Sequence, residues 1–159
     1  MKKISLLLLY IALIFVAKAQ ENKPDGAGTS KAVYAELGGS GLSFSANFDS
    51  RFKGNNGLGY RAGIGFLPGN RGLLTFPLGI NTLIGKGPSF LEAEVTVTPS
   101  SLKAKFHKRT SSIFIFPHIG YRYSKPSGSF NFRIYAGPLL VAGDVLPWAG
   151  LSFGYTLRK

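Results

Sequence analysis

The segment "GLSFSANFDSRF", Gly41 to Phe52, separates apolar and polar residues by parity. One parity holds Leu42, Phe44, Ala46, Phe48 and Phe52, and the other holds Ser43, Ser45, Asn47, Asp49 and Arg51. Successive side chains of a β-strand point to opposite faces, so this segment forms a strand with one apolar and one polar face. An apolar face turned inward indicates a soluble barrel or sandwich. An apolar face turned outward indicates a membrane protein.

The same alternation recurs along the rest of the chain, with turn residues between its copies. It predicts eight strands, at about 31–38, 41–52, 57–67, 73–84, 89–99, 112–124, 129–140 and 146–158. The composition of the 159 residues, with 21 Gly, 13 Phe and only 16% charged residues, is typical of a single all-β domain. We therefore expect an all-β fold, an eight-stranded antiparallel up-and-down barrel.

The N-terminal residues have the features of a secretory signal. Lys2 and Lys3 precede the apolar run "ISLLLLYIALIFVA", and "AKA" ending at Ala19 offers the small residues that signal peptidase reads. The run is about 14 residues long, whereas a membrane-spanning helix needs roughly 20, which disfavours a single-pass anchor. We expect a Sec signal peptide at 1–19, a flexible periplasmic tail at 20–30 and an outer-membrane barrel at 31–159.

The composition of the polar face favours a membrane barrel over a lipocalin-like soluble one. A face in water usually carries Lys and Glu and little Gly, but here the polar parity carries many Gly and no Lys in mid-strand. Arginines and carboxylates in near balance are suited to a paired network in a crowded interior. The expected lumen charge network comprises Glu36, Asp49, Arg51, Arg61, Glu92, Glu94, His118, Arg122 and Arg133.

Aromatic residues and loop lengths favour the same orientation. On the apolar parity, Phe52, Tyr60, Tyr123, Phe130 and Tyr155 would form an aromatic girdle near one rim. The turns at 53–57, 85–88 and 125–128 are short, as periplasmic turns of such barrels are, and the longest connection, 100–111, falls on the outer side. We expect both termini in the periplasm and the apolar parity in contact with lipid.

At these residues the chain resembles a known family. The runs "VYAELGGSGLSFSANFDSRF", "GLGYRAGIGF", "TFPLGINTLIGKG", "FLEAEV", "IGYRY" and "LSFGYTLR" are similar to those of the small outer-membrane β-barrel proteins of Gram-negative bacteria, over Val33 to Arg158. The resemblance implies an outer-membrane barrel and no particular activity. It also implies recognition by the barrel-assembly machinery, for which Tyr155 would stand in for the usual terminal aromatic residue.

Several kinds of chemistry find no support in the sequence. The chain has no Cys, and two His form a poor metal site, so we expect no metal and no cofactor. "GINTLIGKG", Gly79 to Gly87, fails the phosphate-loop spacing. Nucleic acid is not an expected partner, because the signal peptide would carry the chain away from nucleic acid and the positive charges of the chain are dispersed along it. An eight-stranded barrel is filled by its own side chains, which argues against a conducting pore.

Three function hypotheses remain at this point. The first is a non-enzymatic outer-membrane barrel with a plugged, salt-bridged lumen and a structural or surface-interaction role. The second is a lipid A-modifying hydrolase, disfavoured because Ser50 and Thr82 are almost the only hydroxyls expected on the lipid side. The third is a conducting pore, which the narrow interior of an eight-stranded barrel disfavours. The basic loop of Lys103, Lys105, Lys108 and Arg109 either contacts lipopolysaccharide phosphates or is a solvated loop, and both interpretations stay open.

Overall fold

The structure, a computed structural model, describes residues 29–69, 72–102, 111–124 and 130–157. Nearly all of them belong to strands. The strands are β1 (Lys31–Gly38), β2 (Phe44–Arg51), β3 (Gly57–Leu67), β4 (Leu73–Thr75), β5 (Leu78–Ile84), β6 (Ser89–Leu102), β7 (Ser111–Ser124), β8 (Phe130–Val141) and β9 (Asp144–Leu157), and a short 3-10 turn, η1 (Gly39–Gly41), follows β1.

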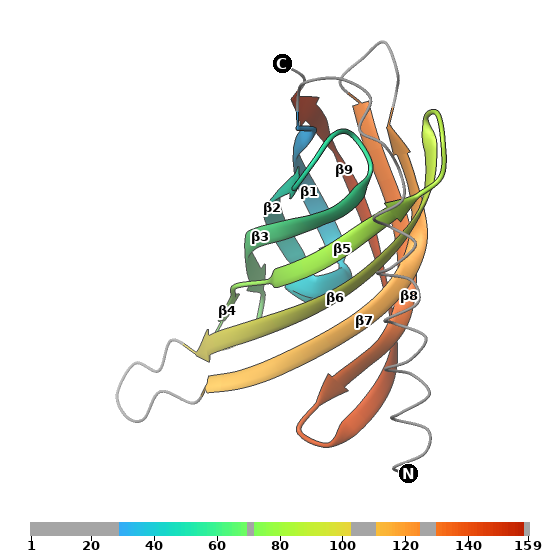
Figure 1. Cartoon of the computed structure of the whole chain (residues 1–159). Helices are drawn as coiled ribbons and strands as arrows, with labels where there is room; N and C mark the ends of the chain where they lie inside the picture. The colour runs from blue at the N-terminus through green and yellow to red at the C-terminus, as the bar shows by residue number, and fades with distance from the viewer. Residues whose placement is uncertain (1–28, 70–71, 103–110, 125–129, 158–159) are drawn as a thin grey trace, which may run out of the picture.

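The strands form a closed barrel in which each is antiparallel to its neighbours in the chain (Figure 1). The circle closes where β1 pairs with β9, with Lys31 opposite Leu157 and Gly38 opposite Gly150. The expected eight-stranded antiparallel up-and-down barrel is thereby confirmed. We call the end where β1 begins and β9 ends the terminal end, and the opposite end the far end.

β4 and β5 are two parts of one barrel strand, which was expected at 73–84. Both pair with β3 in a single register, with Gly65 opposite Thr75 and Ala62 opposite Leu78. The ladder is interrupted because Pro77 has no N–H to donate. One bond survives at this point, since the Gly63 N–H donates to the Pro77 carbonyl at 2.9 Å. The barrel therefore has eight strands although nine segments are assigned.

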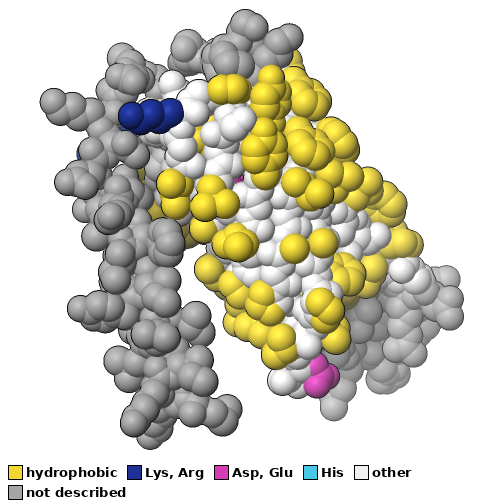
Figure 2. Space-filling model, turned by 90° about the vertical axis from the view of Figure 1, so that its right-hand side faces the viewer, with side chains coloured by type: hydrophobic (Ala, Val, Ile, Leu, Met, Phe, Trp, Pro, Cys, Tyr) yellow, Lys and Arg dark blue, Asp and Glu magenta, His cyan; other side chains and the backbone are white. Residues whose placement is uncertain are grey.

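The two faces of the wall differ sharply in polarity. Ile64, Ile80 and Ile119 on the outside are 53%, 58% and 66% exposed, while the charged residues of the inside parity are at most 4% exposed. Figure 2 shows one outer face covered mainly by hydrophobic side chains, with the larger charged patches near its ends. Among the described residues, no helix has the length and apolarity needed to cross a membrane.

The β1–β2 connection departs from the expected strand at 41–52. β2 begins only at Phe44, and the residues before it turn into the barrel. The expectation that Leu42 faces outward is wrong: its φ is +74° and its side chain is 7% exposed. Parity holds only while the backbone stays extended, and a left-handed residue ends that relation.

Candidate functional site: the lumen network and the inward turn

The first group of charges in the lumen surrounds Asp49 of β2. The Asp49 carboxylate lies 2.8 Å from an Arg51 nitrogen and 3.0 Å from Arg122 of β7. Arg122 also pairs with Glu92 of β6, and Arg133 of β8 lies 3.6 Å from Glu92 and 3.7 Å from Asp49. Opposite charges around shared carboxylates offset the cost of removing each from water.

The second group lies beside the first and includes the His. Arg61 of β3 pairs with Glu36 of β1 and, at 3.4 Å, with Glu94 of β6. Nε2 of His118 lies 3.3 Å from Glu94, and its Nδ1 lies 3.1 Å from the Phe116 carbonyl. The structure thus brings together all nine residues expected in the lumen network, and every one is buried.

Tyr34 joins these two groups. The Arg133 guanidinium lies 3.8 Å from the centroid of the Tyr34 ring, and that of Arg61 lies 5.4 Å from it. A guanidinium over an aromatic face gains cation–π attraction, which is stronger where water is excluded. The Tyr34 ring thus contacts one Arg of each group.

At the far end, the residues from Gly39 to Leu42, which we call the inward turn, are anchored inside the barrel by polar contacts. The Gly41 N–H donates to Glu36 at 3.0 Å, and the Gly41 carbonyl accepts from Thr75 at 3.1 Å. Ser40 accepts from Thr98 at 3.0 Å and from Thr96 at 3.1 Å. The Trp148 indole N–H donates to the Gly39 carbonyl at 2.9 Å. Four barrel strands thus hold one short turn.

Apolar packing complements these hydrogen bonds. Leu42 packs with Phe116, Tyr135 and Leu139, and the half-buried residues Leu67, Leu73, Phe114 and Trp148 surround that cluster. The His118 ring stacks on Phe116 and packs at a tilt against Tyr135, with a centroid distance of 4.5 Å to each. Beneath the inward turn, this apolar cluster therefore lies directly against charged groups, because His118 packs on it and Glu36 bonds to Gly41.

The described residues offer little for catalysis. Glu94 and the Phe116 carbonyl occupy the two ring nitrogens of His118, so no hydroxyl is paired with this imidazole as a nucleophile would be. Ser50 and Thr82 are buried at 4% and 9% exposure, and Ser50 donates to the Arg51 carbonyl. No group of three or more acidic, His or Cys residues suited to a metal ion occurs within the described ranges.

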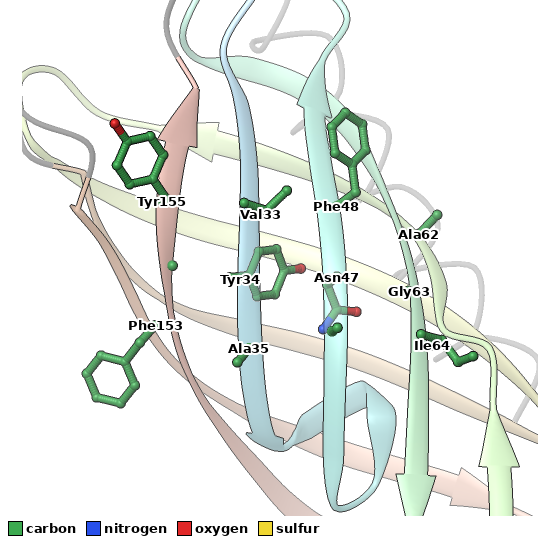
Figure 3. Close-up of a pocket in the computed structure, with 12 residues that line it drawn as sticks. Val33, Tyr34, Ala35, Asn47, Phe48, Ala62, Gly63, Ile64, Phe153 and Tyr155 are labelled. Atoms are coloured by element: carbon green, nitrogen blue, oxygen red, sulfur yellow. The ribbon is translucent and has the colours of Figure 1, made fainter.

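On the outside, a shallow groove crosses β9, β1, β2 and β3 (Figure 3). Val33 and Ala35 of β1 lie between Phe153 and Tyr155 of β9 on one side and Phe48 of β2, with Ala62 and Ile64 of β3 beyond it, on the other. Its lining is almost wholly apolar. Such a surface fits hydrocarbon and offers no group for chemistry.

Some sequence expectations concern residues outside the described ranges. These are the signal peptide, nearly all of the tail, and the basic loop residues Lys103, Lys105, Lys108 and Arg109. The inward turn and its contacts were not predicted. Phe114 and Phe116 could have been placed by parity, because they alternate in step with His118 and Arg122 on the lumen face.

Comparison with known proteins supports the fold and goes no further. No family model matches the chain, and no curated protein does. Among solved structures, the N-terminal β-barrel domain of Pseudomonas aeruginosa OprF is similar with a TM-score of 0.59 and 8% identity, over 81% of this chain and 96% of that one. Neisserial surface protein A (NspA) is similar with a TM-score of 0.46 and 13% identity, over 85% and 100% of the two chains. At 8% identity, the OprF likeness is one of fold alone.

Proposed function

We propose that this chain is an integral outer-membrane barrel with a plugged, salt-bridged lumen and a structural or surface-interaction role, not an enzyme. The observation that carries the proposal is the inverted polarity of the wall. In water, a row of half-exposed Ile, Leu and Phe side chains around a charged interior would be strongly unfavourable, whereas hydrocarbon reverses the balance.

The positions of the exposed charges support a membrane setting. Among the described residues, the exposed charged side chains are those of Lys31, Lys53, Lys86 and Asp144, all at strand ends or in turns. Aromatic side chains collect at the terminal end, where Phe52 packs on Tyr60 at 5.6 Å and Tyr123 on Phe130 at 6.5 Å. Aromatic side chains at one rim and charges beyond it are typical of transmembrane barrels.

The contents of the lumen favour a closed interior over a pore. An eight-stranded barrel has just enough room for its own side chains. Here Arg51, Arg61, Arg122 and Arg133 reach across it from the wall, and the inward turn fills the far end. The lipid A-modifying alternative has no support from the described residues, because His118 has no hydroxyl partner.

The surface role is proposed for the connection between β6 and β7. Lys103, Lys105, Lys108 and Arg109 give it four cations within seven residues. If β1 runs outward from the periplasm, this connection meets the outer leaflet, where lipopolysaccharide phosphates would form charge-assisted hydrogen bonds with these side chains.

Cell fractionation tests the proposal. The full chain, expressed in a Gram-negative host, should sediment with the outer membrane and begin at Gln20 by N-terminal sequencing. Recovery as a soluble periplasmic protein would instead support the lipocalin-like barrel, and retention of Lys2 would exclude a cleaved signal. Mass spectrometry of lipid A from cells with and without the gene should show the same acylation pattern, since a loss of acyl chains would favour the enzyme.

A further inference from the structure

The outer groove on β9, β1, β2 and β3 is hollow because two alanines meet in it. Ala35 of β1 lies directly opposite Ala46 of β2, and both side chains are small. On the far sides of this pair, Phe153 of β9 lies opposite Ala35, and Ile64 of β3 lies opposite Ala46. Phe153 and Ile64 are 47% and 53% exposed, so two large side chains flank two methyl groups. The depression therefore arises from the side chains of four adjacent strands.

The groove continues along β1 toward the terminal end. The next outward residue of β1 is Val33, which lies between Tyr155 and Phe48. Lys31 follows on the same parity at the start of β1, and its side chain is exposed. Because alternate residues of a strand share one face, Ala35, Val33 and Lys31 form one line on the outside of β1. An apolar floor thus leads to a cation.

A second cation lies at the same end of the groove. Lys53, in the β2–β3 turn, is exposed. This turn is held beside the start of β1, because the Ser30 N–H donates to the Gly54 carbonyl at 3.0 Å. Ser30 precedes Lys31 and Gly54 follows Lys53, so the two lysines belong to the same part of the rim. Tyr155 is also exposed, and its hydroxyl points toward this end (Figure 3).

The other end of the groove is apolar. Toward the far end, the next outward residues on the four strands are Leu151, Leu37, Phe44 and Phe66, which lie opposite one another in that order. None of these four side chains carries a charge. A ligand that matches the groove therefore has a long apolar part and an anionic group at one end only. A membrane phospholipid with an anionic headgroup has this form.

We propose that the groove is a docking site for one anionic phospholipid. An acyl chain lies over Val33, Ala35 and Ala46, and the headgroup phosphate pairs with Lys31 and Lys53. Ammonium groups form charge-assisted hydrogen bonds with phosphate oxygens and attract anionic lipids. The source is a phospholipid and not lipid A, because the cationic end of the groove is the terminal end, which the proposed orientation places at the periplasmic leaflet. This inference rests on the proposed membrane location.

Such a site differs in two measurable ways from the shell of lipid that surrounds any membrane protein: it holds one lipid, and it prefers an anionic headgroup. The protein is refolded into vesicles of phosphatidylglycerol and phosphatidylcholine with identical acyl chains, and insertion is established first by a mobility shift on unheated gels. After transfer to detergent, native mass spectrometry identifies the lipid that each barrel retains. We expect one phosphatidylglycerol. Equal retention of the two lipids, or of neither, would overturn the site.

The order of these measurements separates the two proposals. A failure to insert would count against the membrane location, and the gel would show it before any lipid is counted. Insertion followed by a loss of all lipid would leave the membrane location standing and would overturn only the docking site.

The groove itself is tested by filling it. Ala46→Phe places a ring between Ala35 and Ile64, so the retained phosphatidylglycerol should be lost. Ala136→Phe is the matched control, because Ala136 is an exposed outward alanine of β8, a strand that does not line the groove. Both variants add an apolar ring to an apolar face, and the control should retain lipid as the unmodified protein does. Equal retention in the two variants would overturn docking in the groove.

The headgroup contacts are tested by removing charge. The preference for phosphatidylglycerol over phosphatidylcholine should fall by about fivefold for each lysine replaced in Lys31→Gln and Lys53→Gln. Lys86→Gln is the control, because Lys86 is exposed in the β5–β6 turn at the same end of the barrel and does not line the groove. Its preference should not change. An equal fall in Lys86→Gln would indicate a general attraction of anionic lipid to a basic protein and would overturn the headgroup site.

Two further outcomes would assign the groove to another occupant. If lipid A is added to the vesicles and is retained in preference to phosphatidylglycerol, the assignment to a phospholipid is wrong. If native mass spectrometry shows a dimer without lipid, and Ala46→Phe converts it to a monomer, a second copy of the chain occupies the groove and the lipid site is overturned. A monomer that retains phosphatidylglycerol supports the proposal against both.

Discussion

At the residue scale, the wall of the barrel divides neighbouring residues between two environments. Phe44 is 55% exposed on the outside and Ser45 is 7% exposed toward the lumen. The two residues are adjacent in the chain, but their side chains lie on opposite sides of the wall. A shift of one residue in register would exchange the two faces along a strand, so this pair reports directly on the fold.

Cysteine labelling tests this division, because the chain has no native Cys. A lipid-soluble maleimide applied to intact membranes should modify Phe44→Cys readily, since that position lies on the exposed apolar face. Ser45→Cys should be largely protected by the lumen side chains around it. Strong labelling of Ser45→Cys together with protection of Phe44→Cys would reverse the face assignment.

The ion pairs predict a second effect at the same scale. Glu92→Ala removes one of the carboxylates that face Arg122 and Arg133, and should lower the free energy of unfolding by about 3–5 kcal/mol, as expected when a buried charge loses its partner. The measurement is the urea midpoint of the barrel refolded in vesicles. Asp144→Ala, which removes an exposed carboxylate at the start of β9, should change stability by at most about 0.5 kcal/mol. Equal effects of the two changes would mean that Glu92 is solvated.

At the element scale, the inward turn distinguishes this barrel from a plain set of hairpins. Gly39 has a φ of +56°, and a Cβ there would come within 2.5 Å of a Glu36 oxygen and of the Tyr135 hydroxyl. Gly143, in the β8–β9 turn, also has a positive φ, +95°, but has no atom within 4 Å of its would-be Cβ. The two glycines share a positive φ, which an L side chain rarely adopts, and differ in their surroundings.

This difference gives a matched pair of variants. Gly143→Ala should cost about 1–2 kcal/mol, the usual penalty for a left-handed Ala. Gly39→Ala should cost clearly more, because the added methyl group must displace Glu36 or Tyr135, and it should also shift Trp148 emission, since the Trp148 indole bonds to the Gly39 carbonyl. Urea midpoints and emission spectra provide both measurements. Identical costs with unchanged emission would place the turn outside the lumen.

The elements also indicate how far sequence reasoning reaches. Parity predicted every strand within a few residues, because a barrel wall with an apolar outside and a polar lumen imposes period two on each strand. It failed at Leu42, because the residues just before Leu42 are bonded to Thr75, Thr98 and Trp148, which only the closed barrel brings near the inward turn. The lumen residues could be named from their parity, but their partners could not: Asp49 meets Arg122 across 73 positions of the chain, and register and tilt decide that contact.

At the scale of the whole molecule, the proposed plugged lumen predicts that the protein conducts no ions. In a planar lipid bilayer the inserted protein should give no steady single-channel steps, because side chains and the inward turn occupy the interior. A large porin inserted in the same bilayer provides the positive control. Regular steps that grow with salt concentration would show an open path and would contradict the plugged lumen.

The ion pairs that span the lumen also bear on how such a chain reaches its folded state. Arg122 can meet Asp49 only after β2 and β7 have curved around a common axis. These ion pairs therefore stabilise the closed barrel and contribute little to the stability of any single hairpin. Until then the carboxylates and guanidinium groups are free to be hydrated, and each strand carries one polar face. The polar groups that pair in the closed barrel therefore give the unpaired strands a hydrated face, which should oppose aggregation through their apolar side chains.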